Sequence, residues 1–313
     1  MKRAFVFPGQ GSQAVGMGQS LASAFAPARR LLQEVDDALC QPLSRLMFEG
    51  PEGDLTLTEN AQPALMAASL AVIRVLEAES DFELARDVAY VAGHSLGEYS
   101  ALAAAGAVDV GDAARLLKIR GQAMQHAVPV GEGAMAALLG LDVDGAREVA
   151  REAAAGEVCA VANDNAPGQA VVSGHRGAVE RAIGIARERG ARRAIGLPVS
   201  APFHSPLMRP AAAVMENALD RVAFRPPRVP LIANISATAV SDPLAIKRGL
   251  VGQVTAMVRW RESVMFLAAA GIGEIVEIGT GHVLTGLAKR IVPALSSRSA
   301  GTPAEVQSLI EGL

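Results

Sequence analysis

The 313-residue sequence has few aromatic residues and no excess of charge of one sign. It contains eight Phe, two Tyr and one Trp, so the stacking platforms that bind single-stranded nucleic acid are poorly supplied. Lys and Arg number 29 against 32 Asp and Glu, which gives a formal net charge of −3, and no long run carries one sign. We expect no nucleic-acid partner, because such a partner requires a concentrated basic face.

Cysteines and metal-ligand spacings are also scarce. Cys40 and Cys159 lie far apart and form no Cys-x-x-Cys pair, and the five histidines do not show the spacings of metal ligands. A disulfide framework and a structural zinc site are therefore not expected. The sequence predicts no metal and a reducing, cytoplasmic compartment.

Long apolar runs are missing too. The basic pair Lys2-Arg3 precedes a continuously apolar stretch of only four residues, Ala4–Phe7, whereas a signal peptide needs about 7 to 15. No segment reaches the roughly 18 apolar residues of a membrane span. We expect a chain that is not exported and has no membrane partner.

The sequence is rich in aliphatic residues, arranged as alternating strands and helices. An apolar strand at Ala4–Phe7 ends in a Gly-rich loop and precedes a helix at Ser20–Leu39, and a strand at Val88–Ala92 precedes a helix at Leu96–Ala105. This order is typical of an α/β fold. Further helices are predicted over residues 63–76, 112–125, 210–222, 243–253, 260–270 and 283–291, and further strands over 229–234 and 274–278. The Ser-rich tail after Leu295 is expected to be loosely held.

Residues 129–198 consist of shorter elements. Two amphipathic helices alternate with strands at Ala134–Leu141, Val158–Ala162, Ala170–Ser173 and Ala194–Val199, around an Asn-Asp-Asn-Ala-Pro-Gly turn at 163–168. The order β-α-β-β-α-β is that of a ferredoxin-like unit. We predict that 129–198 form a ferredoxin-like domain inserted into a large α/β-hydrolase-like domain, which is made of 1–128 and 199–313.

Gly93-His94-Ser95-Leu96-Gly97 lies between a predicted strand and a predicted helix. In that context Gly-x-Ser-x-Gly forms a nucleophile elbow, whose glycines permit a sharp turn and close approach of the backbone. Ser95 would then be exposed at a helix N-terminus, where the N–H of Leu96 can stabilise an oxyanion. The alternative is a serine that only caps the helix.

A nucleophilic serine needs a base, most often histidine. His204 lies in the proline-bounded loop 200–206, a setting that positions catalytic groups well, although a lone loop histidine is also compatible with a surface or packing role. The other four are less suitable: His94 adjoins the nucleophile but should point away, His126 and His175 lie at helix ends, and His282 lies in a Gly-rich turn.

Two further features are each open to two interpretations. The loop Gly9–Ala14 fits a loose dinucleotide fingerprint, yet the acidic residues available to it, Asp36 and Asp37, fall in a helix-like stretch instead of after a second strand. The same loop could supply a second oxyanion donor. Arg120 lies on an otherwise apolar helix and either binds a carboxylate in its guanidinium fork or extends to solvent.

Several segments taken together resemble one family. They are Phe7–Gln13, Gly93–Tyr99, Arg120-Gly121, Asn163–Gln169, Pro202–Met208, Gln253 and Gly279–Leu284. Over nearly its whole length, from Ala4 to about Val292, the chain resembles the malonyl-CoA:acyl-carrier-protein transacylases of type II fatty acid synthesis. Thr280 and His282 depart from the residues that this family often has in the Gly-rich loop.

The resemblance implies roles for the matching positions. Ser95 would be the acylated nucleophile and His204 its base, with the backbone carbonyl of Gln253 orienting the histidine. Arg120 would bind the malonyl carboxylate. The other implied positions are Gln10 and Leu96, whose N–H groups would form the oxyanion hole, and Asn163, Asn165, Gln169 and Arg193 near the CoA or phosphopantetheine arm.

The resemblance also implies the reaction. A malonyl group would move from malonyl-CoA to the phosphopantetheine thiol of acyl carrier protein, for fatty acid biosynthesis. The route would be ping-pong through a malonyl-serine ester, with no metal or redox cofactor. We expect the protein to be a monomer.

Three other functions compete with this one. A serine esterase or thioesterase shares Gly-His-Ser-Leu-Gly, but no Asp or Glu lies between Arg189 and His204 to complete the usual triad order. A nicotinamide-dependent oxidoreductase would depend on the Gly9–Ala14 loop alone. A catalytically silent module that binds carrier protein is disfavoured by the presence of both Ser95 and His204.

Overall fold

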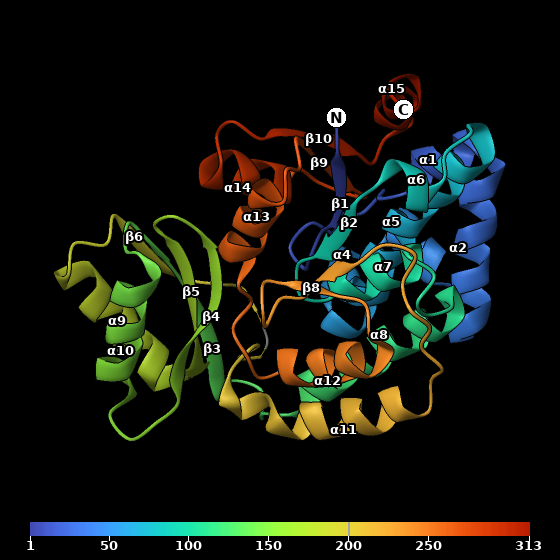
Figure 1. Ribbon diagram of the computed structural model, residues 1–313. Coiled ribbons are helices and arrows are strands. Elements are labelled where there is room, and N and C mark those ends of the chain that lie inside the picture. Colours follow the sequence, from blue (N-terminus) through green and yellow to red (C-terminus); the bar gives the residue numbers. More distant parts are fainter. Residues whose placement is uncertain (200) are drawn as a thin grey trace.

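A six-stranded sheet and a four-stranded sheet organise the chain in the computed structural model, which describes residues 1–199 and 201–313 (Figure 1). In spatial order, the large sheet contains β10 (Ser296–Ala300), β9 (Glu274–Ile278), β1 (Arg3–Phe7), β2 (Tyr90–Gly93), β7 (Leu231–Ile232) and β8 (Ala239–Val240). Neighbouring strands are parallel except for β7 and β8, which are antiparallel. The predicted α/β class is confirmed.

Strand β1 is buried on both faces, as strands of parallel sheets usually are. Phe5 and Phe7 belong to one apolar core, while Ala4 and Val6 belong to a second core on the opposite face. The helices of the first core are α1 (Gln19–Ala24), α2 (Ala26–Leu39), α3 (Leu43–Glu49), α4 (Glu52–Thr56), α5 (Thr58–Glu79), α6 (Leu84–Asp87), α7 (Gly97–Ala104), α8 (Val110–His126), α11 (Arg209–Asp220), α12 (Pro243–Gln253) and α15 (Pro303–Glu311). Those of the second core are α13 (Trp260–Ala269) and α14 (Val283–Ile291).

Helix α5 is long and apolar enough to cross a membrane by length and composition, and it alone meets that criterion in the described part of the chain. However, 83% of its most apolar window is buried inside the fold. It packs against α2 and α8 in the core on the Phe5 and Phe7 face of β1 (Figure 1). These contacts are those of a core helix.

The small sheet contains β4 (Cys159–Ala166), β5 (Gln169–His175), β3 (Gly133–Leu139) and β6 (Arg193–Gly196), in that spatial order and antiparallel throughout. Helices α9 (Val143–Ala154) and α10 (Arg176–Glu188) cover its outer face (Figure 1). Ala136 and Leu138 point to these helices, whereas Met135, just before Ala136 on the opposite face of the strand, joins the main core. The domain bounds at 129 and 198 remain a prediction.

Backbone hydrogen bonds tie the small sheet to the segment that leads into α13. The N–H of Val258, just before α13, donates to the carbonyl of Ala162 in β4 at 2.9 Å, and the N–H of Asp164 donates back to the carbonyl of Val258 at 3.0 Å. The carboxylate of Asp164 also pairs with Arg261 of α13 at 2.9 Å. Strand β4 therefore has a fixed position relative to α13, which packs on the large sheet.

Three predictions about local structure are wrong. The helix expected over Ser20–Leu39 is two helices with Phe25 extended between them, because Pro27 has no N–H to continue the first helix. The polar run at 163–166 continues β4, and only 167–168 turn, because the run is held by partners on other elements. The tail after Leu295 is ordered: β10 pairs with β9, and Thr302 begins α15 with a reciprocal capping box.

Candidate active site

Ser95 lies on a sharp turn between β2 and α7. Its φ is 55°, in the left-handed region that a side chain rarely adopts. A Cβ on Gly93 would lie 1.9 Å from the carbonyl carbon of Gly97, and a Cβ on Gly97 would lie 2.3 Å from the carbonyl oxygen of Phe7. The strand, the turn and the helix can approach so closely only because both positions are glycine, which is the geometry of a nucleophile elbow.

His204 is in direct contact with this serine. The Ser95 hydroxyl donates to Nε2 of His204 at 2.8 Å, and Nδ1–H of His204 donates to the backbone carbonyl of Gln253 at 2.8 Å. The second hydrogen bond leaves the lone pair on Nε2, facing the serine. The predicted pairing of serine, histidine and the Gln253 carbonyl is thus present in the geometry. Ser200, at the start of the predicted loop, lies outside the described residues.

The surroundings of His204 keep its imidazole neutral. Burial and, after it, the nearby positive charge of Arg120 lower the pKa of His204 to about 3. Its side chain is only 5% exposed. At neutral pH the ring is therefore unprotonated and able to accept a proton.

Arg120 lies next to Ser95 and is 1% exposed, so the alternative in which it extends to solvent is wrong. Its Nη2 donates to the Ser95 hydroxyl at 3.0 Å and to Oε1 of Gln253 at 2.8 Å, and its Nη1 donates to Oε1 of Gln62 at 2.7 Å. These partners are all neutral, and its buried Nε–H has no partner among the described residues. The guanidinium therefore has unused capacity for an anion.

Two residues that the sequence did not single out hold the elbow. The amide of Asn234 accepts from the N–H of Ser95 at 2.8 Å and donates to the carbonyl of Gly93 at 2.7 Å. Glu98 accepts from the N–H of Asn234 at 2.6 Å and from Nε2 of Gln253. A polar residue close to the end of a strand, as Asn234 is two residues after β7, could have been the signal.

The predicted oxyanion donors lie on adjoining segments. Leu96 immediately precedes α7. Neither its N–H nor the N–H of Gln10 has a hydrogen-bond partner within residues 1–199 and 201–313. A Cβ on Gly9 would lie 2.8 Å from the carbonyl oxygen of His94, so the loop after β1 packs directly on the elbow. The side chain of Gln10 accepts from Thr58 at 2.9 Å.

The four residues predicted near the CoA arm are not gathered at one point. Asn165 lies at the elbow, where its Oδ1 is 2.9 Å from Nε2 of His94, and Asn163 is buried on the same strand. Gln169 accepts from Arg290 of α14 at 2.9 Å. Arg193 is exposed on β6, two strands away from Gln169. Only Asn165 contacts the elbow directly.

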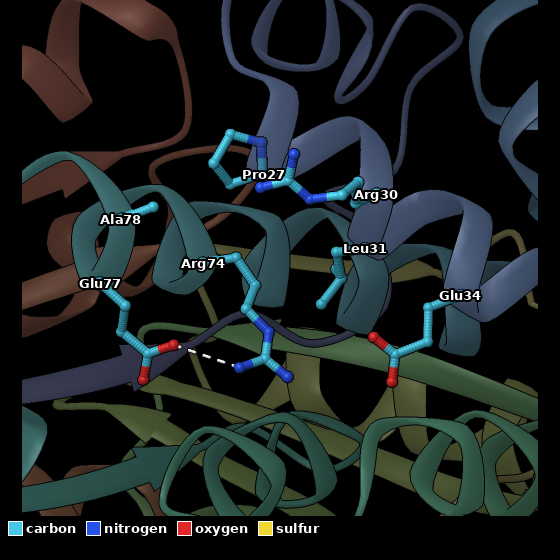
Figure 2. Close-up of a pocket in the computed structure, with 7 residues that line it drawn as sticks. All are labelled: Pro27, Arg30, Leu31, Glu34, Arg74, Glu77 and Ala78. Atoms are coloured by element: carbon cyan, nitrogen blue, oxygen red, sulfur yellow. Dashed lines mark hydrogen bonds and ion pairs between the residues drawn. The ribbon is translucent and has the colours of Figure 1, made fainter.

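One surface groove lies away from the residues that contact Ser95. A groove of about 420 Å³ between α2 and α5 is lined by charged side chains of both signs, and Arg74 there is paired with Glu77 at 3.2 Å (Figure 2). In the described part of the chain, no group of three or more His, Cys, Asp and Glu side chains is placed to hold a metal.

Comparison with known proteins identifies the family. Residues 4–307 match the acyl transferase domain. The malonyl CoA-acyl carrier protein transacylase of Bacillus subtilis is 45% identical over all 313 residues, which cover 97% of that protein. The chain belongs to the acyl transferase family.

Solved structures of similar proteins match the fold of this chain over its whole length. An acyl-carrier-protein-S-malonyltransferase from Bartonella henselae has a TM-score of 0.98 and 54% identity, covering 100% of this chain and 99% of that one. A type II PKS acyl-carrier protein in complex with its malonyl-transacylase gives a TM-score of 0.97 at 42% identity, covering 100% of both chains. The chain is thus an enzyme of the malonyl CoA-acyl carrier protein transacylase group, which argues against the esterase, the oxidoreductase and the silent binding module.

Proposed function

We propose that this acyl transferase moves a malonyl group from malonyl-CoA to the phosphopantetheine thiol of acyl carrier protein, for fatty acid biosynthesis. The observation that carries the proposal is the position of Arg120, a buried cation 3.0 Å from the nucleophilic hydroxyl with only neutral partners among the described residues. A buried charge without a counter-ion in direct contact is costly, and a carboxylate on the acyl group would supply that contact. The names of the relatives agree with this choice.

In the first half-reaction, Ser95 attacks the thioester carbonyl. His204 Nε2 takes the hydroxyl proton as the bond from Oγ to the carbonyl carbon forms, and the Gln253 carbonyl stabilises the resulting imidazolium through Nδ1–H. The N–H groups of Leu96 and Gln10 would donate to the oxyanion. The carbon–sulfur bond then breaks, the CoA sulfur takes the proton from His204, and malonyl-Ser95 remains.

In the second half-reaction, the phosphopantetheine thiol replaces CoA. His204 takes the thiol proton, the sulfur attacks the ester carbonyl, and Ser95 leaves as a hydroxyl after taking the proton back. Because CoA leaves before the carrier protein reacts, the kinetics are ping-pong. No step requires a metal or a redox cofactor.

Further features of the proposal follow from the fold. The large sheet would be α/β-hydrolase-like and the small one, whose spatial order is β4-β5-β3-β6, ferredoxin-like. Asn163, Asn165, Gln169 and Arg193 on the small sheet would line the path of the CoA or pantetheine arm. We propose a cytoplasmic monomer, with malonyl-CoA and acyl carrier protein as its partners.

Intact-mass measurement after mixing with malonyl-CoA tests the proposal. One malonyl group should be added to the wild-type chain and none to Ser95→Ala, whereas Ser23→Ala, which removes an exposed serine of α1, should acylate normally. Addition of carrier protein with its phosphopantetheine arm should move the group to that protein. An adduct on Ser95→Ala would exclude Ser95 as nucleophile, and faster release of free malonate than transfer would indicate a hydrolase.

A further inference from the structure

Glu98 is a buried carboxylate inside the active-site network, to which neither the motif nor the reaction gives a role. It lies in the first turn of α7, three residues after Ser95, and is 2% exposed. Its Oε1 accepts from the backbone N–H of Asn234 at 2.6 Å, and its Oε2 accepts from Nε2 of Gln253. A carboxylate buried this deeply needs a structural or chemical reason.

The two partners of Glu98 hold the nucleophile from both sides. Asn234 accepts from the N–H of Ser95 at 2.8 Å, and Gln253 donates to the carbonyl of Ser95 at 2.9 Å. Gln253 also orients His204 through its backbone carbonyl. Glu98 thus fixes the two residues on which the serine and its base depend, without itself touching the reacting atoms.

Glu98 is also connected to Arg120 through a single amide group. Oε1 of Gln253 accepts from Nη2 of Arg120 at 2.8 Å, and Nε2 of the same side chain donates to Glu98. The cation and the carboxylate therefore polarise the two ends of one amide. In the described part of the chain, Arg120 has no hydrogen bond to a carboxylate. Glu98 is the carboxylate connected to it, through the side chain of Gln253.

Resting on the proposed function, we infer that Glu98 is a positioning residue and the resident counter-charge of Arg120, and that it takes up a proton when the malonyl carboxylate binds this guanidinium. The substrate brings a second negative charge to a site that holds one cation. Two carboxylates near one cation in a buried site cannot both remain ionised at low cost, so one of them binds a proton. The malonyl carboxylate contacts the guanidinium directly, which leaves Glu98 as the group that is neutralised.

The proton has a route to Glu98 that does not pass through the reacting atoms. A cavity of about 280 Å³ is lined by Glu98 together with Leu231, Ile246 and Arg248. Solvent reaching this cavity can deliver a proton to the carboxylate, and the protonated oxygen keeps a lone pair for the N–H of Gln253. The network can therefore persist in both protonation states.

The electrostatic surroundings of Glu98 suit this exchange near neutral pH. Burial raises the pKa of Glu98 to about 7, while hydrogen bonds from Asn234 and Gln253 and the charge of Arg120 oppose the rise. The other titratable groups around it are Tyr99, which is next along α7, and Arg248, which shares the cavity. An added anion beside Arg120 raises the pKa of Glu98 further, so binding takes up a proton in the window just above pH 7.

Calorimetry of substrate binding to Ser95→Ala tests the inference, because this variant cannot be acylated. Titrations of malonyl-CoA in two buffers of different ionisation enthalpy give the number of protons taken up. We expect an uptake of up to about one proton per chain between pH 7 and 8, falling towards zero at pH 5, where Glu98 is already protonated. Acetyl-CoA, which lacks the carboxylate, should show no such uptake.

Variants at Glu98, made in the Ser95→Ala background, show whether Glu98 is the group that takes up the proton. Glu98→Gln keeps the size of the side chain and should abolish the uptake, whereas Glu98→Asp keeps a carboxyl group and should restore it. Uptake that persists in Glu98→Gln would overturn the inference, because another group, such as His204, would then be taking up the proton. The comparison of malonyl-CoA with acetyl-CoA keeps Glu98 unaltered, so equal proton uptake with the two thioesters would overturn the inference even if Glu98→Gln does not fold.

The outcome for this inference can be distinguished from that for the proposed function. If malonyl-CoA acylates the wild-type chain but binds Ser95→Ala without proton uptake, the inference alone is wrong. If malonyl-CoA neither acylates the wild-type chain nor binds Ser95→Ala, the proposed function fails and the inference fails with it.

Discussion

Nη2 of Arg120 donates to Oε1 of Gln253 at 2.8 Å, so the residue whose backbone carbonyl orients His204 also holds the guanidinium next to Ser95. The base and the cation are therefore both attached to the last residue of α12. Because the side chain and the backbone of Gln253 move together, a displacement that loosens one contact loosens the other. The positions of base and cation are coupled in this way.

Replacement of Arg120 by Ala should change substrate preference more than it changes overall rate. The variant loses charge-assisted hydrogen bonds to the malonyl carboxylate, worth about 1.5 to 3 kcal/mol, so kcat/KM for malonyl-CoA should fall about 10- to 100-fold more than kcat/KM for acetyl-CoA. Steady-state kinetics with the two thioesters measures the ratio.

Arg115→Ala is the matched control for this experiment. It removes a cation from the same helix, but its guanidinium is half exposed and pairs with Asp112 at 2.7 Å. Neither thioester should be affected. Equal losses with both thioesters in Arg120→Ala would show that Arg120 supports the site only structurally.

The acid limit of the reaction should lie far below that of an ordinary histidine. His204 must be neutral to accept the serine proton, and its pKa of about 3 keeps it neutral down to about pH 4. For a histidine with the usual pKa near 6.5, the neutral fraction would fall about 20-fold between pH 7 and pH 5. We expect kcat/KM for acetyl-CoA, which reports the free enzyme, to change little over that interval.

The same measurement on Arg120→Ala gives the direction of the electrostatic effect. The charge of Arg120 lowers the pKa of His204, so its removal should shift the acid limb to higher pH. A wild-type limb between pH 6 and 7, or no shift in the variant, would contradict the buried, neutral state of His204.

Removal of the base should slow acylation strongly without preventing substrate binding. In His204→Ala no side chain takes the Ser95 proton, and a general base typically contributes about 10² to 10⁴ in rate. Single-turnover mass spectrometry with malonyl-CoA measures the acylation rate. His126→Ala, which removes an exposed histidine at the end of α8, serves as the control and should acylate at the wild-type rate. Near-normal acylation of His204→Ala would require a different base.

The parts of the site that could be predicted from the sequence are those with local signals. The elbow is encoded by two glycines around Ser95, and β2 and α7 on either side of it are apolar segments. The sequence of strands and helices along residues 129–198 follows similarly from short, regular elements. The C-terminal tail was missed because its Ser-rich strand is stabilised by pairing with β9, a contact that composition does not reveal.

The remainder of the site depends on contacts between distant segments. Asn234 and Gln253 reach Ser95 across 139 and 158 residues of sequence, and Gln62 reaches Arg120 across 58. Each of these three is an ordinary amide in its local context, and only the fold gives it a partner. Arg120 was recognisable as unusual on an apolar helix, yet its own sequence context could not tell a buried cation from an exposed one.

The close approach at the elbow predicts a strong and specific effect for Gly93→Ala. The new Cβ would meet the backbone of Gly97 at 1.9 Å, and a backbone atom cannot move aside as a flexible side chain can. Forcing the turn apart should lower the free energy of unfolding by about 1 to 3 kcal/mol and should displace Ser95 from His204, with loss of acylation.

Gly184→Ala in α10 is the matched control, because a Cβ there has no atom within 4 Å. An exposed helical glycine replaced by alanine should stabilise the chain by about 0.5 to 1 kcal/mol and leave acylation intact. Denaturant unfolding and intact mass after malonyl-CoA measure both effects, and normal acylation by a folded Gly93→Ala chain would show that the position of Ser95 does not depend on this contact.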